Sequence, residues 1–382
     1  MAREVSMLSP VWMEVWTRRP AVFSYQLGLK ELGYYDKRID GIYGKGSATA
    51  VKNFQDNFNS RPDGIIGPET STELLTQATA QGWEPGLKKR IMEVIAFYEI
   101  AGSHNAFGRA SKIADGAGAN YGVMQANRHG SCLRILKLGG NKKLADKYYK
   151  SDKMTIDEEI AKWFGSPYGI QAQCKYFDKV IWSIAKRIVM DLPGVDSWDT
   201  RGIPFQRLML LAVDTVVQNG GLYSPSNKPF WRNSEGTDSP KLRELFTGER
   251  WDRFLGSWVP YAELKSHWDN AGGKTAGRGD ERKAVNRNVI HDLWNRAPDN
   301  IARLVMLAQY RARCSWSKYW TAVERRRMTD ATGEGMVNGR TLHLARDFNV
   351  GIDAPSMPDR EPTPEDFHKE AGADILQSLK LS

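Results

Sequence analysis

The chain has 382 residues, of which 41% are hydrophobic, and this length allows two or three domains with sizeable cores. No stretch approaches the roughly 20 consecutive apolar residues of a membrane helix, so we expect no stable membrane insertion. The formal net charge of +9 favours an anionic polymer as partner, yet no zinc finger, recognition helix or phosphate-binding loop is present, so we expect no nucleic-acid partner. The three Cys and six His are widely spaced, and we expect no disulfide framework, metal site or cofactor.

Residues 1–20 form an apolar, aromatic leader that contains Trp12 and Trp16 and ends at Pro20. We expect this leader to be a short helix packed on the residues that follow. It lacks the charged and then apolar layout of a secretory signal. The sequence therefore predicts synthesis in the cytoplasm without a signal peptide.

An internal repeat follows the leader. The segment Asp40-Gly41-Ile42-Tyr43-Gly44 recurs 23 residues later as Asp63-Gly64-Ile65-Ile66-Gly67. In each copy we expect a tight loop in which the Asp side chain bonds its own backbone and the Gly takes a positive φ. Helices are predicted before the first loop, over Val22–Leu32, and after each loop, where Ser47 and Thr70 are expected to act as capping hydroxyls.

These motifs resemble the three-helix peptidoglycan-binding module of bacterial and phage wall hydrolases over about 55 residues. The hallmarks L-x-x-L-G-Y-Y, D-G-I-Y-G, A-V-x-x-F-Q and D-G-I-x-G-x-x-T are nearly all present. The resemblance implies a wall-binding domain over residues 1–80 with peptidoglycan as its partner. It also implies wall contact by four residues of the two loops: Asp40, Tyr43, Asp63 and Ile65. A generic pair of helical hairpins is the alternative.

Residues 81–87 have the composition of a linker, and residues 88–350 are predicted to be mostly helical. One long helix is expected over Ile170–Met190, ending before a Leu-Pro-Gly sequence. A second helix, over Phe205–Val217, is apolar almost throughout and is therefore expected to be buried. A third is expected to start at Ala297–Asn300 and to run into an Arg-rich portion.

Two carboxylates have different settings in the stretch from residue 99 to residue 125. Glu99 closes the apolar, helix-like run Ile91–Tyr98, whereas Asp115 opens a turn of small residues, Gly116–Gly118. Glycoside hydrolysis needs two carboxylates on either side of a sugar bond, one that keeps its proton and one that stays ionised. An apolar helix end and a Gly-rich turn supply those two settings, although each residue alone is more often a solvated helix-end Glu or a turn Asp.

The run D-G-A-G-A-N-Y-G-V-M-Q, residues 115–125, resembles the D-G-x-G-x-S-[FY]-G-x-[LM]-Q signature of phage-type lysins related to the chitosanases, within the lysozyme superfamily. In that family F-E-[TG] supplies the acid. Here Phe97-Tyr98-Glu99 takes its place, with Tyr98 inserted and Ile100 where the family has glycine. Further blocks follow in the family's order: Ser131–Leu136, Asp214–Gly220, Arg325–Met328 and Ala331–Gly339.

The resemblance implies a mainly α protein, with a small three-helix wall-binding domain followed by a larger, lysozyme-like helical catalytic domain over residues 88–350. The implied activity is that of a muramidase-type endolysin, which cleaves β-1,4 bonds between N-acetylmuramic acid and N-acetylglucosamine and lyses the host. Glu99 would protonate the glycosidic oxygen, and Asp115 would activate a water or stabilise the developing charge. The cleft would be lined by three residues that bind the sugar: Tyr121, Gln125 and Asn127.

Two points stay open from the sequence. Asp214 and Gln218, one turn apart on a predicted helix, either reach the same cleft or brace it. The stereochemical outcome depends on the separation of the two carboxyl groups, since about 5–5.5 Å suits a nucleophile and about 6.5–9.5 Å leaves room for water. The chitosanase resemblance favours inversion.

Other functions fit parts of the same sequence. A lytic transglycosylase that uses Glu99 alone and a chitosanase are the enzymatic alternatives. A non-catalytic phage structural or wall-attachment protein is an alternative of another class. We expect a monomer that acts on the cell wall after release from the host cell, and a flexible, acidic, Pro-containing tail over residues 351–382.

Overall fold

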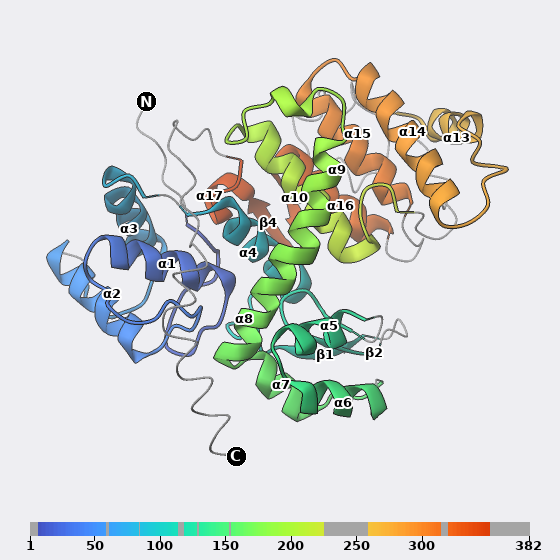
Figure 1. Ribbon diagram of the computed structural model, residues 1–382. Coiled ribbons are helices and arrows are strands. Elements are labelled where there is room, and N and C mark those ends of the chain that lie inside the picture. Colours follow the sequence, from blue (N-terminus) through green and yellow to red (C-terminus); the bar gives the residue numbers. More distant parts are fainter. Residues whose placement is uncertain are drawn as a thin grey trace. The chain divides into compact units, whose positions relative to one another are not determined.

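The computed structural model describes residues 7–58, 61–83, 85–113, 118–127, 130–152, 154–224, 259–314 and 320–351. The described chain is mainly α-helical with a few short strands, which confirms the predicted fold class (Figure 1). It forms two compact units: the first holds the described residues up to 178 and residues 346–349, and the second holds residues 179–345 and 350–351. The predicted linker lies inside the first unit, so the division into a wall-binding and a catalytic domain stays a prediction. The predicted acidic tail lies outside the described residues from residue 352 onwards.

The first unit begins with the helices of the repeat, α1 (Pro20–Glu31), α2 (Lys45–Asn57) and α3 (Pro68–Ala80), followed by α4 (Leu87–Ile100). α1 packs against all three of the others, so the core of this region runs along it (Figure 1). The first helix was predicted from Val22 and starts two residues earlier, because the fixed φ of Pro20 suits a first helical position.

Both repeat loops have the predicted geometry. Asp40 Oδ1 accepts a hydrogen bond from the backbone N–H of Ile42 at 2.9 Å, and Asp63 Oδ1 accepts one from Ile65 at 2.9 Å. The glycine that follows each Asp has the predicted positive φ, +74° in the first loop and +76° in the second. The repeat in the sequence is therefore a repeat in the structure.

The predicted capping hydroxyls are wrong. A glycine precedes each helix, and no side chain caps either of them. Ser47 and Thr70 lie inside the first turns, where both are buried and accept hydrogen bonds from the side-chain amides of Gln26 and Gln55. A buried amide needs acceptors, and these hydroxyls supply them instead of bonding the helix ends.

The predicted leader helix is also wrong. The described leader is extended, with one turn near Trp16, and it runs along both repeat loops. Met13 pairs with Ile66 through two backbone hydrogen bonds of 3.1 and 3.0 Å. The backbone carbonyl of Tyr43 accepts a hydrogen bond from the Trp16 N–H at 2.7 Å, and the Tyr43 N–H donates one to the Thr17 carbonyl at 2.8 Å. An extended leader pairs with backbone groups of the two loops, which a helix would not do because its own backbone groups bond each other.

A β-hairpin follows α4 in the first unit. β1 (Ala110–Ile113) and β2 (Gly118–Tyr121) are antiparallel, with Ala110 opposite Tyr121 and Ile113 opposite Gly118. The next helices are α5 (Ser131–Leu138), α6 (Lys142–Lys150), α7 (Glu158–Phe164) and α8 (Pro167–Tyr176). α5 packs against α6 and α8, and α7 packs against α8.

The long helix predicted over Ile170–Met190 is present, with an irregular segment in the middle. α8 continues into a π-helical segment, η1 (Phe177–Trp182), and then into α9 (Ser183–Met190). The run ends at the predicted place, just before Leu192-Pro193-Gly194.

The core of the second unit forms around α10 (Ile203–Asn219), which packs against α9, α15 (Asn300–Arg313) and α16 (Trp320–Thr332). Residues 208–213 of α10 are all completely buried, as predicted. α15 begins where expected, with Asp299 Oδ1 accepting a hydrogen bond from the Ala302 N–H at 2.8 Å. The remaining elements are η2 (Val195–Ser197), α13 (Tyr261–Asn270), α14 (Asp280–Arg296), the hairpin of β3 (Glu334–Val337) and β4 (Arg340–His343), and α17 (Leu344–Phe348).

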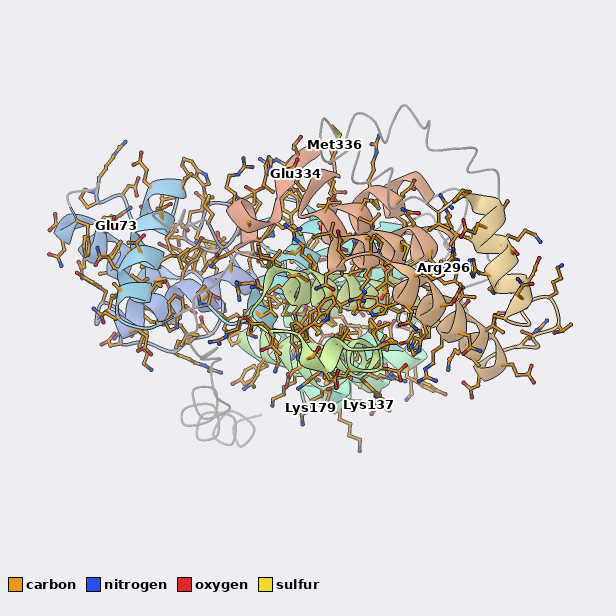
Figure 2. All side chains as sticks on the ribbon, turned by 90° about the horizontal axis from the view of Figure 1, so that it is seen from above. Glu73, Lys137, Lys179, Arg296, Glu334 and Met336 are labelled. Atoms are coloured by element: carbon orange, nitrogen blue, oxygen red, sulfur yellow. The ribbon has the colours of Figure 1, made fainter. Side chains whose placement is uncertain are left out.

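Charged side chains such as Lys137 and Lys179 project from the surface into solvent (Figure 2). Among the described residues, no helix is both long enough and apolar enough to cross a membrane. Within the same ranges, no three His, Cys, Asp or Glu side chains lie close enough together to hold a metal ion.

Candidate functional site

Glu99 lies in the last turn of α4, one residue before the helix ends, and is half-buried. Ile91, Val94 and Ile95 of the same helix are completely buried. The helix stops because Ala101 has a φ of +48°, outside the right-handed helical region. The apolar helix end predicted from the sequence is therefore present, with a carboxylate at the edge of a packed core.

Glu93, the other carboxylate of α4, has a different environment. It is 0% exposed, and its Oε1 accepts hydrogen bonds from Ser9 Oγ at 2.6 Å and from Arg19 Nε at 2.7 Å. Its Oε2 accepts the backbone N–H of Ala21 at 3.1 Å. Because both oxygens are occupied by protein donors and closed off from solvent, Glu93 holds the leader and the start of α1 against α4 and is not available to a substrate.

Arg19 also fastens the chain that follows Glu99. Its Nη1 donates to the backbone oxygens of Ala101 at 3.2 Å and Ser103 at 2.5 Å. Next to it, the Arg18 N–H donates to the His104 carbonyl at 2.7 Å. The leader that crosses the two repeat loops therefore also fixes the segment directly after the candidate acid.

The second candidate carboxylate, Asp115, lies outside the described residues. It comes after β1 and before β2 in the chain, so the strands on either side of it are known while its own position is not described. Its catalytic role stays a prediction.

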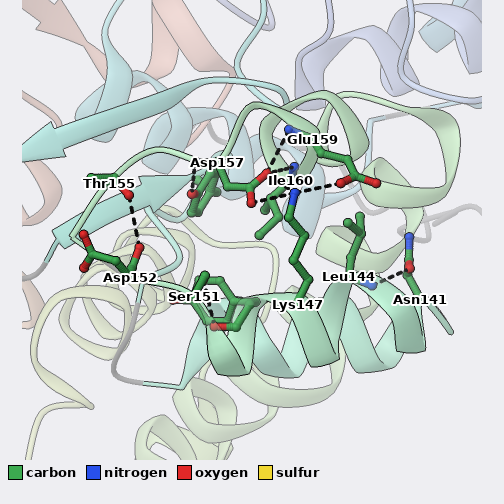
Figure 3. A network of polar contacts seen from close by, with 11 residues as sticks. Asn141, Leu144, Lys147, Ser151, Asp152, Thr155, Asp157, Glu159 and Ile160 are labelled. Carbon is green, nitrogen blue, oxygen red and sulfur yellow. Dashed lines mark hydrogen bonds and ion pairs between the residues drawn. The ribbon is translucent and has the colours of Figure 1, made fainter.

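Tyr121 is almost completely buried, at 1% exposed, and its ring packs on Phe164 with 5.5 Å between the centroids. Its hydroxyl accepts the backbone N–H of Asp157 at 2.8 Å. Figure 3 shows Asp157 at the centre of a polar network, where its carboxylate takes hydrogen bonds from Lys147 and from backbone N–H groups at the start of α7. Burial raises the pKa of Tyr121. Tyr121 thus links β2 to α7, and sugar contact by it stays a prediction.

Gln125 is also largely buried. Its Oε1 accepts a hydrogen bond from Ser111 Oγ at 2.7 Å, and its Nε2 donates to the Gly122 carbonyl at 3.2 Å. These contacts bind β1 to the turn after β2. Asn127 is half-buried, and its backbone N–H donates to Ser131 Oγ at 3.0 Å. The structure brings Tyr121, Gln125 and Asn127 together around one hairpin, and their contact with a sugar stays a prediction.

Asp214 and Gln218 lie on α10 in the second unit. Asp214 is completely buried and forms ion pairs with Arg326 and, at 3.9 Å, with Arg327 Nε. Gln218 Oε1 accepts a hydrogen bond from Arg327 Nη2 at 3.3 Å. Of the two roles that the sequence leaves open, these contacts favour bracing. They also join two blocks of the lysin resemblance that lie more than a hundred residues apart in the chain.

The four predicted wall-binding residues take part in the two repeat loops. Tyr43 is 1% exposed and donates its hydroxyl hydrogen to the Gly64 carbonyl at 2.7 Å, which joins one loop to the other. Asp40 and Asp63 bond their own loops, and Ile65 is half-buried. These contacts explain why the loops keep their shape, and wall contact by the four residues stays a prediction.

Sequence reasoning missed two buried glutamines that organise the loops. Gln26 Oε1 accepts hydrogen bonds from the backbone N–H groups of Asp40 and Gly41, and Gln26 Nε2 donates one to the Asp40 carboxylate, all at 3.1 Å. Gln55 makes the equivalent contacts with Gly64 at 2.8 Å and Asp63 at 3.0 Å. The signal was present in the sequence, because an aromatic residue followed by Gln precedes each loop, as Tyr-Gln in the first copy and Phe-Gln in the second.

Cys132 is a poor candidate nucleophile. It is completely buried in α5, and burial raises the pKa of its thiol to about 12. A thiol with that pKa is almost entirely protonated at neutral pH, whereas the thiolate is the reactive form. A cysteine amidase built on Cys132 is therefore disfavoured.

The segment that contains the repeat matches a known protein family. Residues 18–74 match the family described as "Putative peptidoglycan binding domain". The chain is 40% identical over 53 residues to the spore cortex-lytic enzyme of Halalkalibacterium halodurans, which is 14% of this chain and 16% of that enzyme. It is 41% identical over 58 residues to the spore cortex-lytic enzyme of Bacillus subtilis, or 15% of this chain and 19% of that enzyme. The corresponding enzyme of Oceanobacillus iheyensis is 40% identical over 58 residues, 15% of this chain and 21% of that enzyme. The chain thus covers only about a fifth or less of these three relatives. No solved structure matches it.

Proposed function

We propose that this protein is a peptidoglycan hydrolase of the muramidase type, which binds the bacterial cell wall through its N-terminal repeat and cleaves the β-1,4 bonds of the glycan strand. The match of residues 18–74 to a peptidoglycan-binding family carries this proposal. The similarity of that segment to spore cortex-lytic enzymes supports a lytic role. Holding the enzyme on an insoluble polymer raises the local substrate concentration without changing the chemistry of cleavage.

In this proposal Glu99 is the general acid that protonates the glycosidic oxygen. Its position supports the assignment, because the end of a helix with buried apolar side chains places a half-buried carboxyl group at the edge of a packed core. Asp115 activates the attacking water on the opposite face of the sugar, which gives inversion of configuration. Arg19 keeps the chain after Glu99 in place through its bonds to the Ala101 and Ser103 carbonyls. The reaction needs no cofactor.

We further propose that the protein is a phage lysin, made in the host cytoplasm as a monomer and acting on the wall after release. The order of the lysin-like blocks in the sequence supports this source. The contact of Asp214 with Arg326 agrees with it, because both residues belong to blocks of that resemblance.

Three alternatives predict different products. A lytic transglycosylase that uses Glu99 alone releases anhydro-sugar ends, a chitosanase cleaves a deacetylated glucosamine polymer in preference to peptidoglycan, and a wall-attachment protein releases nothing. Incubation of the purified full-length protein with insoluble peptidoglycan and, in parallel, with chitosan, followed by mass spectrometry of the soluble products, separates them. Release from chitosan in preference to peptidoglycan indicates the chitosanase. Fragments with new reducing ends and no anhydro-sugar support the proposal. Anhydro-sugar products, or bound protein without any release, contradict it.

A further inference from the structure

The leader carries an unusual concentration of exposed apolar surface. Trp12 is 55% exposed, Val15 37% and Trp16 64%, so this short segment holds three of the seven exposed large hydrophobic side chains in the described part of the chain. Single exposed apolar residues are ordinary, but a cluster that includes two Trp marks an interaction site more often than an accident of the surface.

Each of the two Trp lies at one repeat loop. The backbone N–H of Trp16 donates to the carbonyl of Tyr43 in the first loop at 2.7 Å. The indole of Trp12 lies 3.7 Å from the place that a Cβ on Gly67, the last residue of the second loop, would take. Four residues of chain span at most about 14 Å, so both rings are within reach of one extended polymer.

The backbone holds Trp16 outward at a conformational cost. Its φ is +79°, a value that a bulky side chain rarely takes. The turn is closed by a hydrogen bond from the Thr17 N–H to the Glu14 carbonyl at 2.9 Å and by one from the Glu14 N–H to Thr17 Oγ1 at 3.2 Å. Strain of this kind persists where the surrounding structure enforces it, and it is concentrated at ligand sites.

The charge of this region indicates what kind of contact it makes. Residues 7–83 contain eight Lys or Arg and eight Asp or Glu, so their formal charge is zero although the whole chain carries +9. Net charge therefore does not explain how this part of the protein would hold an anionic wall. Ring stacking and hydrogen bonding to uncharged sugar do not depend on net charge.

We propose that Trp12 and Trp16 form a glycan-binding surface on which the pyranose rings of one peptidoglycan strand stack. Indoles offer a large, rigid apolar face with a polar N–H at its edge, which suits a sugar ring whose faces are apolar and whose rim carries hydroxyl groups. Neither residue lies within the matched segment 18–74, so the surface extends the family module at its N-terminal side. This inference rests on the proposed function.

The test is sedimentation of the full-length protein with purified insoluble peptidoglycan in high salt, where attraction through the net charge is screened. The parent protein carries Glu99→Gln to protect the substrate. Trp12→Ala and Trp16→Gly should each weaken binding about threefold to tenfold, and the double variant should weaken it further. Tyr149→Ala removes an aromatic side chain that is 69% exposed on α6 and serves as the matched control, with binding equal to the parent.

Trp16→Gly keeps the test independent of folding, because glycine takes a positive φ without strain and the melting temperature should not fall. A soluble β-1,4-linked N-acetylglucosamine oligomer should displace the parent from the wall. The inference is overturned if the double Trp variant binds the wall as tightly as the parent, or if Tyr149→Ala loses as much binding as the Trp variants. It is also overturned if phosphatidylglycerol vesicles retain the parent as well as the wall does. A parent protein that does not sediment with the wall at all contradicts the proposed function itself.

Discussion

Arg19 and Glu93 form a completely buried ion pair, with 2.7 Å between Arg19 Nε and Glu93 Oε1, between the leader and the middle of α4. The two residues are 74 positions apart in the sequence. The same guanidinium bonds the Ala101 and Ser103 carbonyls just beyond Glu99. One side chain thus connects the segment that crosses the two repeat loops to the helix that carries the candidate acid.

Removal of one partner of this pair should destabilise the protein strongly. Glu93→Gln leaves Arg19 buried without a counter-charge, and we expect the free energy of unfolding to fall by about 3–5 kcal/mol. The double variant Arg19→Met, Glu93→Leu should recover part of that loss, because it leaves no buried charge. Chemical denaturation of the three proteins measures both effects. A loss below about 1 kcal/mol in Glu93→Gln would mean that the pair is not buried as described.

Gly41 of the first repeat loop and Gly33, which follows α1, should not tolerate a side chain equally. Gly41 has a φ of +74°, and a Cβ there would lie 2.4 Å from the ring of Phe23. Gly33 has a φ of +81° and no atom within 4 Å of such a Cβ. Gly33→Ala should therefore cost about 1 kcal/mol from the backbone alone, and Gly41→Ala about 2–4 kcal/mol because overpacking adds to it. Equal melting temperatures for the two variants would argue against the tight contact of loop and α1.

Asp157 should give the protein a pH-dependent contribution to stability. Partial burial acts to raise the pKa of Asp157, but hydrogen bonds from Lys147 and from the Ile160 N–H outweigh it and hold that pKa below its usual value. Because the pKa of Asp157 is lower in the folded protein, its ionised form stabilises the fold at pH values above the pKa of the unfolded protein, which is about 4. This stabilisation is lost as the pH falls through the pKa of the folded protein.

Asp157→Asn keeps a residue that can cap α7 but removes the charge. The variant should melt below wild type at pH 7, and the difference should shrink steadily in acid. Asp146→Asn, an exposed residue of α6, is the control and should show no such trend. A melting difference that stays constant with pH would show that the charge of Asp157 does not stabilise the link to Tyr121.

Asp115→Asn distinguishes a catalytic carboxylate from a turn residue. If Asp115 activates water, hydrolysis should fall about 10²–10⁴-fold with little change in melting temperature, and azide should restore part of the turnover as an external nucleophile. An Asp that only shapes a turn would lower stability by roughly 0.5–2 kcal/mol and leave the rate per folded molecule unchanged. The second result would favour the transglycosylase alternative.

Local patterns in the sequence predicted local structure well. The side chains of Asp40 and Asp63 bond backbone N–H groups two residues further along, so this part of the loop geometry could be assigned from the sequence alone. α10 could be predicted as a buried helix because its apolar residues are continuous. The π-helical segment at η1 has no comparable signal in its residues, and the prediction there gave a single regular helix.

Contacts between distant residues could not be predicted in the same way. Trp12 and Trp16 are four residues apart, which is also a helical spacing, but the leader is extended because it pairs with loops some 27 to 53 residues further along the chain. The buried position of Glu93 follows from its apolar neighbours, whereas the identity of Arg19 as its partner depends on the fold. The sequence leaves open whether Asp214 reaches the cleft or braces it, and only its contact with Arg326 favours bracing.

If Glu99 is the general acid of a wall hydrolase, its loss should stop the release of reducing ends from purified insoluble peptidoglycan. Wild type, Glu99→Gln and Glu73→Gln are compared at equal concentration, with Glu73 as a control because it is a half-buried glutamate of α3 in the same unit. Gln preserves the size of the side chain but cannot donate a proton, so Glu99→Gln should lose at least about 10²-fold in rate while keeping its melting temperature and its binding to the wall. A folded Glu99→Gln protein that releases reducing ends within a few-fold of wild type would show that Glu99 is not the general acid.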